Sequence, residues 1–342
     1  MKVLVIKLTS MGDLLHLFPA LSDLQKHNPK LCVDWMVEDS FAEIPAWHPS
    51  VEKVISVGSR RWRSLNWKNL KEFLVFFRQL RQEKYDLVID AQGLMKSAGF
   101  AYFARLNKGG KRVGFSADSI KESPAAKFYK EKINVKRDQH AIVRLRQLFA
   151  QAFDYSYNEK SSVDYQIKLP EKPTQNQPRQ SIFFLHGTTW SSKHLPDQIW
   201  RDLVGLVTDD GYQVKLSWGN DKEKKRAEWI AEKNKYAEVL PKQNLSALAK
   251  QLQDSVAVIG VDTGLGHLAA ALNLPAISIY GATNAELTGA LSSNQIHLQT
   301  DYPCSPCLLK KCNKITKQVM QAPCYQTLSA ADIWQPLYEK IA

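Results

Sequence analysis

A carboxylate, a hydroxyl and an imidazole lie close together in VAVIGVDTGLGHLAAALNLPAISIYGAT, residues 256–283. The apolar first part of this stretch breaks at Asp262-Thr263-Gly264, after which apolar residues recur at helical spacing. The pattern predicts a strand that enters a helix through a tight turn. The free N–H groups of such a turn and the positive end of the helix can bind phosphate without a metal. We therefore expect Asp262, Thr263 and His267 to surround a nucleotide phosphate.

A second turn with phosphate-binding groups lies in FLHGTTWSSKHLPDQIW. The apolar run 181–186 predicts a strand, and Thr188, Thr189 and Lys193 follow it before the next helix. Two hydroxyls and one cation suit a diphosphate, and a lysine can stabilise the negative charge that grows on a departing phosphate. The alternative is that Lys193 is an ordinary solvated surface lysine.

The amino-terminal strand ends in a comparable turn. KVLVIK predicts a strand, LTSMGD a short turn and LLHLFPALSDL a helix. Asp13 then lies at the carboxyl edge of the sheet, where open α/β sheets bind ligands. One interpretation is a general base that faces an interdomain cleft. The other is a helix cap, because Ser10 and Asp13 have the spacing of a capping box.

Strand and helix patterns alternate along the whole chain. Strands are expected at 2–7, 31–37, 85–90, 181–186, 213–217, 256–261 and 275–280, and helices at 14–26, 68–82, 138–153, 197–208, 222–234 and 329–341. The alternation favours parallel sheets covered by helices on both faces.

The chain is long enough for more than one core. It has 342 residues, 44% of them hydrophobic, which exceeds the size at which single cores usually split. Residues 161–180 are rich in proline and glutamine without a periodic apolar face, as is typical of a linker. We expect four parts: an N-terminal domain over 1–165, a linker over 166–180, a C-terminal domain over 181–328 and a terminal helix over 329–342 that packs on the N-terminal domain.

The composition limits the partners and the compartment. The formal net charge of +12 indicates an acidic partner, which could be nucleic acid, anionic lipid headgroups or a phosphorylated sugar. No apolar run reaches the roughly 18 residues of a membrane span. The apolar stretch of MKVLVIKLTSMGD is too short for a signal peptide, so a cytoplasmic protein is expected.

Five ordered motifs resemble those of the bacterial lipopolysaccharide heptosyltransferases of glycosyltransferase family 9, most closely heptosyltransferase I. They are VLVIKLTSMGDLLHLFPAL, DLVIDAQGLMKSA, FLHGTTWSSKHLP, KLSWGNDKEKKRA and VDTGLGHLAAALNLPAISIYGAT, and they span residues 3–283. The resemblance implies an α/β fold of the GT-B type, with two Rossmann-like doubly wound domains that face a central cleft and a C-terminal helix that crosses back. The donor is then held by the C-terminal domain and the acceptor by the N-terminal one, with no metal or other cofactor in catalysis. The lack of an Asp-x-Asp pair, a usual metal ligand of sugar transferases, agrees with this.

The resemblance also implies a reaction and a set of roles. The reaction is the inverting transfer of heptose from ADP-L-glycero-β-D-manno-heptose to the Kdo region of a lipid A–Kdo2 acceptor, in the synthesis of the lipopolysaccharide inner core. The implied roles are Asp13 as catalytic base, Thr188, Thr189 and Lys193 at the diphosphate, Glu223 at the ribose, Gln243 near the adenine, Asp262 at heptose hydroxyls, and Thr263, Gly264 and His267 around the phosphates.

Structural alternatives remain for several of these residues. Asp262 could cap its helix. His267 could be a packed histidine on the inner helix face. Glu223 lies in DKEKKRAE, a charge pattern typical of a solvated helix face.

The acceptor side is expected in the basic and aromatic segment RRWRSLNWKNLKEFLVFFRQLR, residues 60–81. Leu70, Phe73, Leu74, Phe77 and Leu80 fall on one apolar stripe, among the cations Arg60, Arg61, Arg63, Lys68, Lys71, Arg78 and Arg81. The segment suits the phosphates and Kdo carboxylates of a lipid A precursor and could rest on an anionic inner leaflet. The alternative is an ordinary amphipathic packing helix. Arg60, Arg61 and Arg63 match a basic acceptor-side loop of the family, and Lys121 and His140 are weaker candidates.

The cysteines depart from the family pattern. Cys304, Cys307, Cys312 and Cys324 form a cluster of four thiols, far in sequence from Cys32. In a cytosolic protein this spacing favours a structural zinc or iron site over disulfides, and free thiols are the alternative. Because such clusters are commoner in other branches of the family, heptosyltransferase II or another transferase acting on a later core sugar is the alternative enzyme.

The expected partners follow from the reaction. They are ADP-heptose, the lipid A–Kdo2 acceptor and a peripheral contact with the cytoplasmic face of the inner membrane, without nucleic acid. The non-enzymatic alternative is a basic nucleotide- or nucleic-acid-binding protein, which has no use for a carboxylate such as Asp13.

Overall fold

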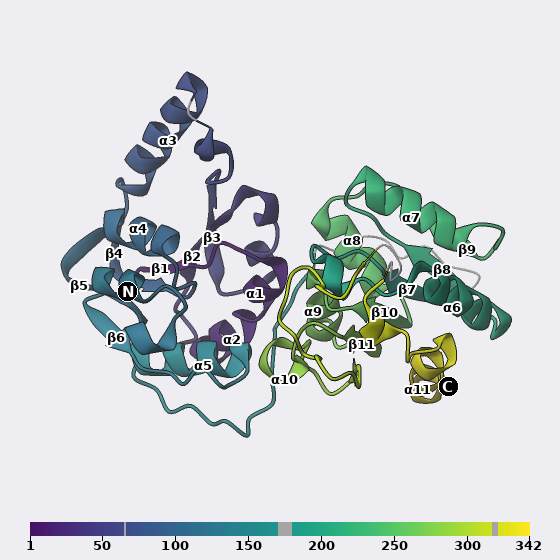
Figure 1. Cartoon of the computed structure of the whole chain (residues 1–342). Coiled ribbons are helices and arrows are strands. Elements are labelled where there is room, and N and C mark those ends of the chain that lie inside the picture. Colours follow the sequence, from purple (N-terminus) through teal and green to yellow (C-terminus); the bar gives the residue numbers. More distant parts are fainter. Residues whose placement is uncertain (65, 170–179, 317–320) are drawn as a thin grey trace. The chain divides into compact units, whose positions relative to one another are not determined.

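The chain folds into two compact α/β units. The computed structural model describes residues 1–64, 66–169, 180–316 and 321–342 (Figure 1). The contacts divide the chain into Met1–Lys168 and Leu169–Ala342. Each unit is built on a six-stranded parallel sheet.

The first unit orders its strands β3-β2-β1-β4-β5-β6. The strands are β1 (Val3–Ile6), β2 (Val33–Glu38), β3 (Val51–Val57), β4 (Lys84–Asp90), β5 (Arg105–Phe115) and β6 (Glu131–Ile133). The α-helices are α1 (Met11–Leu15), α2 (Phe18–His27), α3 (Trp67–Leu80), α4 (Met95–Phe103) and α5 (Ala141–Ala152). Short 3-10 helices are η1 (Asp39–Phe41), η2 (Pro45–Trp47), η3 (Arg61–Arg63), η4 (Ala117–Ser119) and η5 (Ser123–Phe128).

The second unit orders its strands β12-β11-β10-β7-β8-β9. The strands are β7 (Ser181–Leu185), β8 (Gln213–Leu216), β9 (Ala237–Val239), β10 (Ala257–Val261), β11 (Ala276–Tyr280) and β12 (Gln295–Gln299). The helices are η6 (Ser191–Lys193), α6 (Asp197–Asp209), α7 (Asp221–Ala231), α8 (Leu245–Gln253), α9 (Gly264–Ala271), α10 (Ala285–Thr288), η7 (Pro323–Tyr325) and α11 (Ala330–Ile341).

The two sheets have the same topology, which confirms the predicted pair of doubly wound folds. From its middle, each sheet runs outward in one direction through its first three strands and in the other through its last three. The direction therefore reverses between β1 and β4 in the first unit and between β7 and β10 in the second. Open α/β sheets bind ligands at the carboxyl ends of the strands beside such a reversal.

The central strands are buried and the outer ones are not. All residues of β1, β7, β10 and β11 are buried, which explains why apolar runs revealed them. The sequence expectation missed β3 and β5, because most of their residues are partly or fully exposed and charged residues interrupt their apolar ones.

The terminal helix completes the second core. Its buried residues Ile333, Trp334 and Leu337 join a cluster that includes Ile182 and Trp200. The helix α11 contacts α6 and the strands β10, β11 and β12. Its apolar face thus packs on the core of the C-terminal unit.

The expected linker is described only in part, because its residues 170–179 lie outside the described residues. Among the residues that the structure describes, no helix has both the length and the apolar character needed to cross a bilayer.

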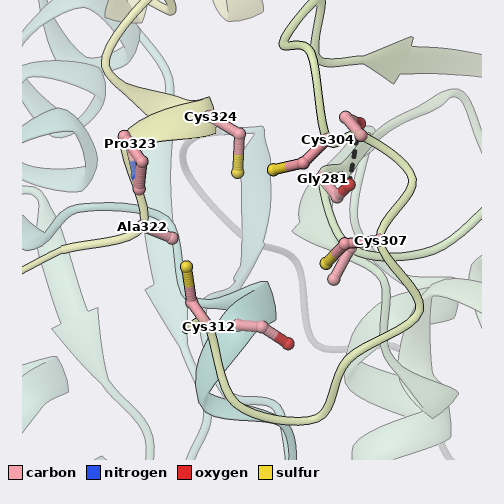
Figure 2. Close-up of a pocket in the computed structure, with 10 residues that line it drawn as sticks. Gly281, Cys304, Cys307, Cys312, Ala322, Pro323 and Cys324 are labelled. Carbon is pink, nitrogen blue, oxygen red and sulfur yellow. Dashed lines mark hydrogen bonds between the residues drawn. The ribbon is translucent and has the colours of Figure 1, made fainter. Parts of the chain in front are cut away.

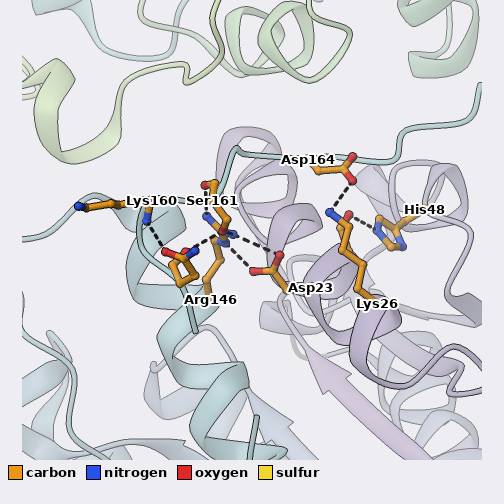
Figure 3. A network of polar contacts seen from close by, with 9 residues as sticks. Asp23, Lys26, His48, Arg146, Lys160, Ser161 and Asp164 are labelled. Carbon is orange, nitrogen blue, oxygen red and sulfur yellow. Dashed lines mark hydrogen bonds and ion pairs between the residues drawn. The ribbon is translucent and has the colours of Figure 1, made fainter. Parts of the chain in front are cut away.

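A buried ion pair joins α2 and α5 in the first unit. Arg146 on α5 is 2% exposed and donates from Nε to Oδ2 of Asp23 on α2 at 2.6 Å (Figure 3). The same guanidinium donates to Oγ of Ser161 at 2.5 Å, and Lys26 pairs with Asp164 at 2.9 Å. These contacts fasten the last segment of the first unit to α2 and α5.

Candidate active site

The carboxyl ends of β7 and β10 bring together two of the predicted phosphate-binding turns. Thr188, which follows β7, donates from its hydroxyl to the backbone carbonyl of Asp262 at 3.3 Å. Asp262 follows β10 directly, and its N–H donates to the carbonyl of Ile279 on β11. The two turns, separated by more than seventy residues, therefore lie side by side at the strand reversal of the second sheet.

The carboxylate of Asp262 is the centre of this site. Its Oδ2 accepts from the Lys193 ammonium and from the Thr283 hydroxyl, both at 2.6 Å. Its Oδ1 lies 3.9 Å from Nε2 of His267. The side chains of Lys193 and Asp262 are 14% and 9% exposed, so their charges interact in a medium less polar than water. Lys193 is therefore a largely buried, paired lysine, and the N-cap of α9 is Thr263 and not Asp262.

The start of α9 adds the turn predicted to bind phosphate. Thr263 is the residue before the helix, in extended backbone conformation, and its side chain makes no capping hydrogen bond. The first N–H groups of an α-helix have no partner within the helix. The hydroxyl of Thr263 and the amides at Gly264 therefore suit an anion next to Asp262.

Glu223 lies in α7 but is turned toward the site. Its Oε2 accepts from the N–H of Gly219 at 2.7 Å. A Cβ at Gly187, directly after β7, would come within 3.1 Å of the Glu223 carboxyl carbon. Gly187 thus leaves room for this carboxylate, which is half-buried.

The two remaining donor-side candidates differ in their surroundings. Gln243 has a buried side-chain oxygen with no hydrogen-bond partner among the described residues. A buried acceptor without a donor is costly, so a ligand N–H at this position would stabilise it. Thr189 is exposed, and nothing in the structure brings its side chain to Asp262.

Sequence reasoning missed Arg226, which holds the loop after β7. Its guanidinium donates to the carbonyls of His186 and Leu195, at 2.7 and 2.5 Å, and pairs with Asp197 at 2.5 Å. Burial, reinforced by the charge of Arg226, lowers the pKa of His186 to about 3. Arg226 lies in the charged run DKEKKRAE, so the sequence alone did not distinguish it from its charged neighbours.

The loop that carries Lys193 is fixed from the cysteine-rich segment. The Ser192 hydroxyl donates to the carbonyl of Leu309 at 2.5 Å, and the Ser192 N–H donates to the carbonyl of Lys310 at 3.4 Å. The Leu308 N–H in turn donates to the carbonyl of Ala282. This segment therefore links η6 to the turn after β11, next to Thr283.

The four clustered cysteines line one small cavity. Cys304, Cys307, Cys312 and Cys324 line a space of about 10 Å³ between this segment and η7 (Figure 2). Within the described parts of the chain, no group of three or more His, Cys, Asp or Glu side chains is placed to hold a metal ion. Burial and the neighbouring thiols raise the pKa of Cys324 to about 11, which favours a protonated thiol. The structure therefore gives the predicted zinc or iron site no support, and the described cysteines form no disulfide.

In the first unit, Asp13 lies at the equivalent strand reversal. Its Oδ2 accepts from the N–H and the hydroxyl of Ser10, both at 2.8 Å. The loop before it is tied to the turn after β4, because Gln92 accepts from the N–H groups of Leu8 and Thr9 at 3.0 and 3.2 Å. The capping-box interpretation is confirmed, and the half-buried carboxylate is held in one orientation.

A buried lysine beside Asp13 was not predicted. Lys7 is 7% exposed, and its ammonium donates to the carbonyl of Ala91 at 2.9 Å. Burial is the main cause of its lowered pKa, and the charges of Asp13 and Asp90 act in the opposite direction. The only sequence signal was a lysine at the end of an apolar strand.

The predicted acceptor-side residues separate into two groups. Arg61 pairs with Asp39 and Glu72, and His140 caps α5 by accepting from the N–H of Ile142, so both have structural roles. Arg63 and Lys121 are exposed.

The loop after β3 is fixed by a buried acid. Glu38 is fully buried, accepts from the N–H of Arg60 at 3.0 Å and from the Ser59 hydroxyl at 2.5 Å, and lies 3.6 Å from Lys96. The side chain of Arg60 lies over the ring of Phe41.

The chain is similar to proteins of known family. The model of the family described as glycosyltransferase family 9 (heptosyltransferase) matches residues 73–317. Lipopolysaccharide heptosyltransferase 1 of Pseudomonas aeruginosa is 45% identical over 316 residues, which cover 91% of this chain and 87% of that protein. The protein of the same name from Escherichia coli K12 is 44% identical over 302 residues, 86% of this chain and 92% of that one. The solved structure of E. coli heptosyltransferase WaaC with ADP is 37% identical and superposes with a TM-score of 0.86, covering 99% of this chain and 100% of that one.

Proposed function

Because the chain belongs to glycosyltransferase family 9, the heptosyltransferases, we propose that it is a heptosyltransferase I. It transfers heptose from ADP-L-glycero-β-D-manno-heptose, with inversion, to the Kdo region of a lipid A–Kdo2 acceptor. The observation that carries the proposal is the group of Thr188, Lys193 and Asp262 at the strand reversal of the second sheet.

The donor site is proposed from the second unit. Lys193, Thr188 and the start of α9 bind the diphosphate, where positive charge and N–H groups lie together. Glu223 accepts from the ribose hydroxyls, and the buried oxygen of Gln243 accepts from the adenine amino group. A related solved structure, E. coli WaaC with ADP-2-deoxy-2-fluoro heptose, holds an analogue of this donor and superposes with a TM-score of 0.83 over 99% of each chain.

The chemical step needs one base and a stabilised leaving group. Asp13 takes the proton from the acceptor hydroxyl as that oxygen attacks the anomeric carbon. The bond between this carbon and the diphosphate oxygen breaks, and ADP leaves with the electron pair. Lys193 stabilises the charge on the diphosphate, and Asp262, with Thr283 and His267 beside it, orients the heptose hydroxyls. No step requires a metal ion.

The acceptor is proposed to bind at the carboxyl edge of the first sheet. The exposed cations Arg63 and Lys121 suit the phosphates and Kdo carboxylates of the lipid, together with Arg60, whose backbone Glu38 holds in place. Arg61 acts indirectly, because its contacts with Asp39 and Glu72 fix the loop that carries its neighbours. Since such an acceptor is a membrane lipid, the protein works in the cytoplasm, at the inner face of the inner membrane.

An acceptor screen at constant ADP-heptose tests this proposal. We expect ADP release with lipid A–Kdo2, and none with lipid A that lacks Kdo or without an acceptor. A preference for lipid A–Kdo2 that already carries one heptose would instead identify a heptosyltransferase II. No ADP release with any of these acceptors, from a protein that binds ADP, would overturn the proposal.

A further inference from the structure

The helix α3 packs through only one side of its apolar surface. Phe76 and Leu80 are buried and belong to the core of the first unit. The ring of Phe77 packs on Phe100 and Phe103, at centroid distances of 6.0 and 5.0 Å. These contacts attach the second half of the helix to α4.

The other face is exposed and is not explained by the fold. Trp67 is 87% exposed, Leu70 47% and Leu74 50%. Spacings of three and four residues place these side chains on one side of a helix, turned away from Phe76 and Leu80. The stripe predicted from the sequence is therefore only partly covered, because Leu80 is buried and Phe77 half-buried, whereas Leu70 and Leu74 are exposed. Figure 1 shows α3 projecting from the rest of the first unit.

The exposed face is also basic. Lys68, Lys71 and Arg78 lie among its apolar residues, and all three are exposed. The acid of this helix, Glu72, is paired with Arg61 at 2.5 Å. Large apolar side chains surrounded by cations are typical of a helix that lies in a membrane interface, and tryptophan is enriched there.

We propose that this face, formed by Trp67, Lys68, Leu70, Lys71, Leu74 and Arg78, is the docking surface for an anionic phospholipid bilayer. The apolar side chains insert at the level of the headgroups, and the cations contact lipid phosphates. The inference rests on the proposed function for its setting, because a lipid acceptor brings the enzyme to a bilayer. It goes beyond that function by assigning the contact to one helix face, apart from the site at Asp13.

A second copy of the chain is a poorer occupant. In a symmetric contact through α3 the same patch meets itself, so Lys68, Lys71 and Arg78 of both copies would approach each other. Like charges placed together at an interface are strongly unfavourable. An anionic surface satisfies the apolar and the basic side chains at once.

Vesicle flotation tests the proposal. The probes are vesicles of phosphatidylcholine alone and of phosphatidylcholine mixed with phosphatidylglycerol. We expect the wild type to bind the mixed vesicles and to bind the neutral ones weakly. The variant Lys71→Gln/Arg78→Gln should lose about 30-fold in binding to the mixed vesicles, because each cation contributes about 1 kcal/mol near such a surface. The variant Trp67→Ala/Leu70→Ala/Leu74→Ala should lose at least about tenfold.

Matched controls separate this effect from net charge and from misfolding. The exposed residues Lys132 and Lys225 lie outside α3, and Lys132→Gln/Lys225→Gln should bind the mixed vesicles within about twofold of the wild type. Lipids with brominated acyl chains should quench the tryptophan fluorescence of the wild type. This quenching should decrease in Trp67→Phe, which keeps eight of the nine tryptophans. The unfolding midpoints of all variants should match the wild type, since the substituted side chains are exposed.

Enzyme assays distinguish failure of this inference from failure of the proposed function. With a water-soluble acceptor whose acyl chains have been removed, the triple alanine variant should turn over at the wild-type rate, and with acceptor embedded in mixed vesicles it should be slower. Unchanged vesicle binding by both α3 variants would overturn the inference and leave the transferase proposal intact. A wild-type dimer that the triple alanine variant dissociates would also overturn it, because α3 would then be an interface between copies.

Discussion

The Lys193 ammonium lies 2.6 Å from Oδ2 of Asp262, although 69 residues separate them in sequence. The same oxygen accepts from Thr283, so one carboxylate oxygen receives two donors from two different loops. A bound diphosphate competes for the lysine, which carries the only full positive charge among these three groups. We therefore propose that donor binding and leaving-group stabilisation meet at this pair.

Removal of the cation should slow the chemical step. In Lys193→Gln we expect kcat to fall by about 100-fold or more, because a preorganised group that stabilises transition-state charge contributes roughly 3–4 kcal/mol. Lys193→Arg should retain part of the activity, since it keeps the charge but not the geometry. Single-turnover kinetics with saturating acceptor measure this. A Gln variant with the wild-type single-turnover rate would remove Lys193 from the chemical step.

Thr283 is predicted to be a positioning residue. Thr283→Val keeps the shape of the buried side chain but leaves Asp262 with one donor fewer, so we expect KM for ADP-heptose to rise by about tenfold. Thr283→Ser restores the hydroxyl and should recover most of the affinity. Steady-state kinetics at several donor concentrations measure the effect of each variant on kcat and on KM separately. Equal loss in the Val and Ser variants would show that packing, and not the hydroxyl, matters here.

The first unit should lose stability in mild acid through His48. Burial lowers the pKa of this histidine from 6.5 to about 4, so the unfolded chain binds more protons than the folded one between these values. Stability contributed by neutral His48 is therefore present above pH 6.5 and is lost as the pH falls toward 4, by up to about 1.4 kcal/mol per pH unit. Native-state hydrogen exchange of β2 amides, corrected for intrinsic rates, measures this.

The variant His48→Gln provides the control for this pH dependence. Its β2 amides should start from a lower stability, because contacts with Ser22 and Ser50 are altered, and should show a flatter slope. An identical slope in both proteins would assign the acid sensitivity to other groups.

The thiols should react in a fixed order. Cys32 is exposed. The pKa of Cys324 is raised from 9.0 to about 11, so below pH 9 its thiolate fraction is about 100-fold smaller than that of a cysteine with the ordinary pKa. We expect alkylation at mildly basic pH to modify Cys32 first and Cys324 last, with no change on addition of a chelator. Mass spectrometry of timed samples measures the order. Joint protection of all four clustered thiols that a chelator abolishes would show a bound metal and contradict the free-thiol structure.

Sequence patterns revealed the parts of the fold that are buried and regular. The apolar runs at β1, β7, β10 and β11 identified the central strands, and the turns after them gave Asp13, Thr188, Lys193 and Asp262. Edge strands such as β3 were missed, because half-exposed strands carry polar residues and lack a clear period.

The remaining differences depend on tertiary contacts. Thr283 and Arg226 became visible only once their partners Asp262 and His186 were placed. The sequence of α3 allowed both a packing helix and a membrane-facing one, because its exposed residues are as apolar as its buried ones.

The most direct test of the proposed mechanism compares turnover and ADP binding in Asp13 variants. Asn at this position can still accept hydrogen bonds from Ser10, so Asp13→Asn preserves the cap but cannot take a proton. We expect ADP release with lipid A–Kdo2 to fall by about 1,000-fold or more in Asp13→Asn and Asp13→Ala, while calorimetry gives an unchanged affinity for ADP. Wild-type turnover by Asp13→Asn would show that another group removes the proton.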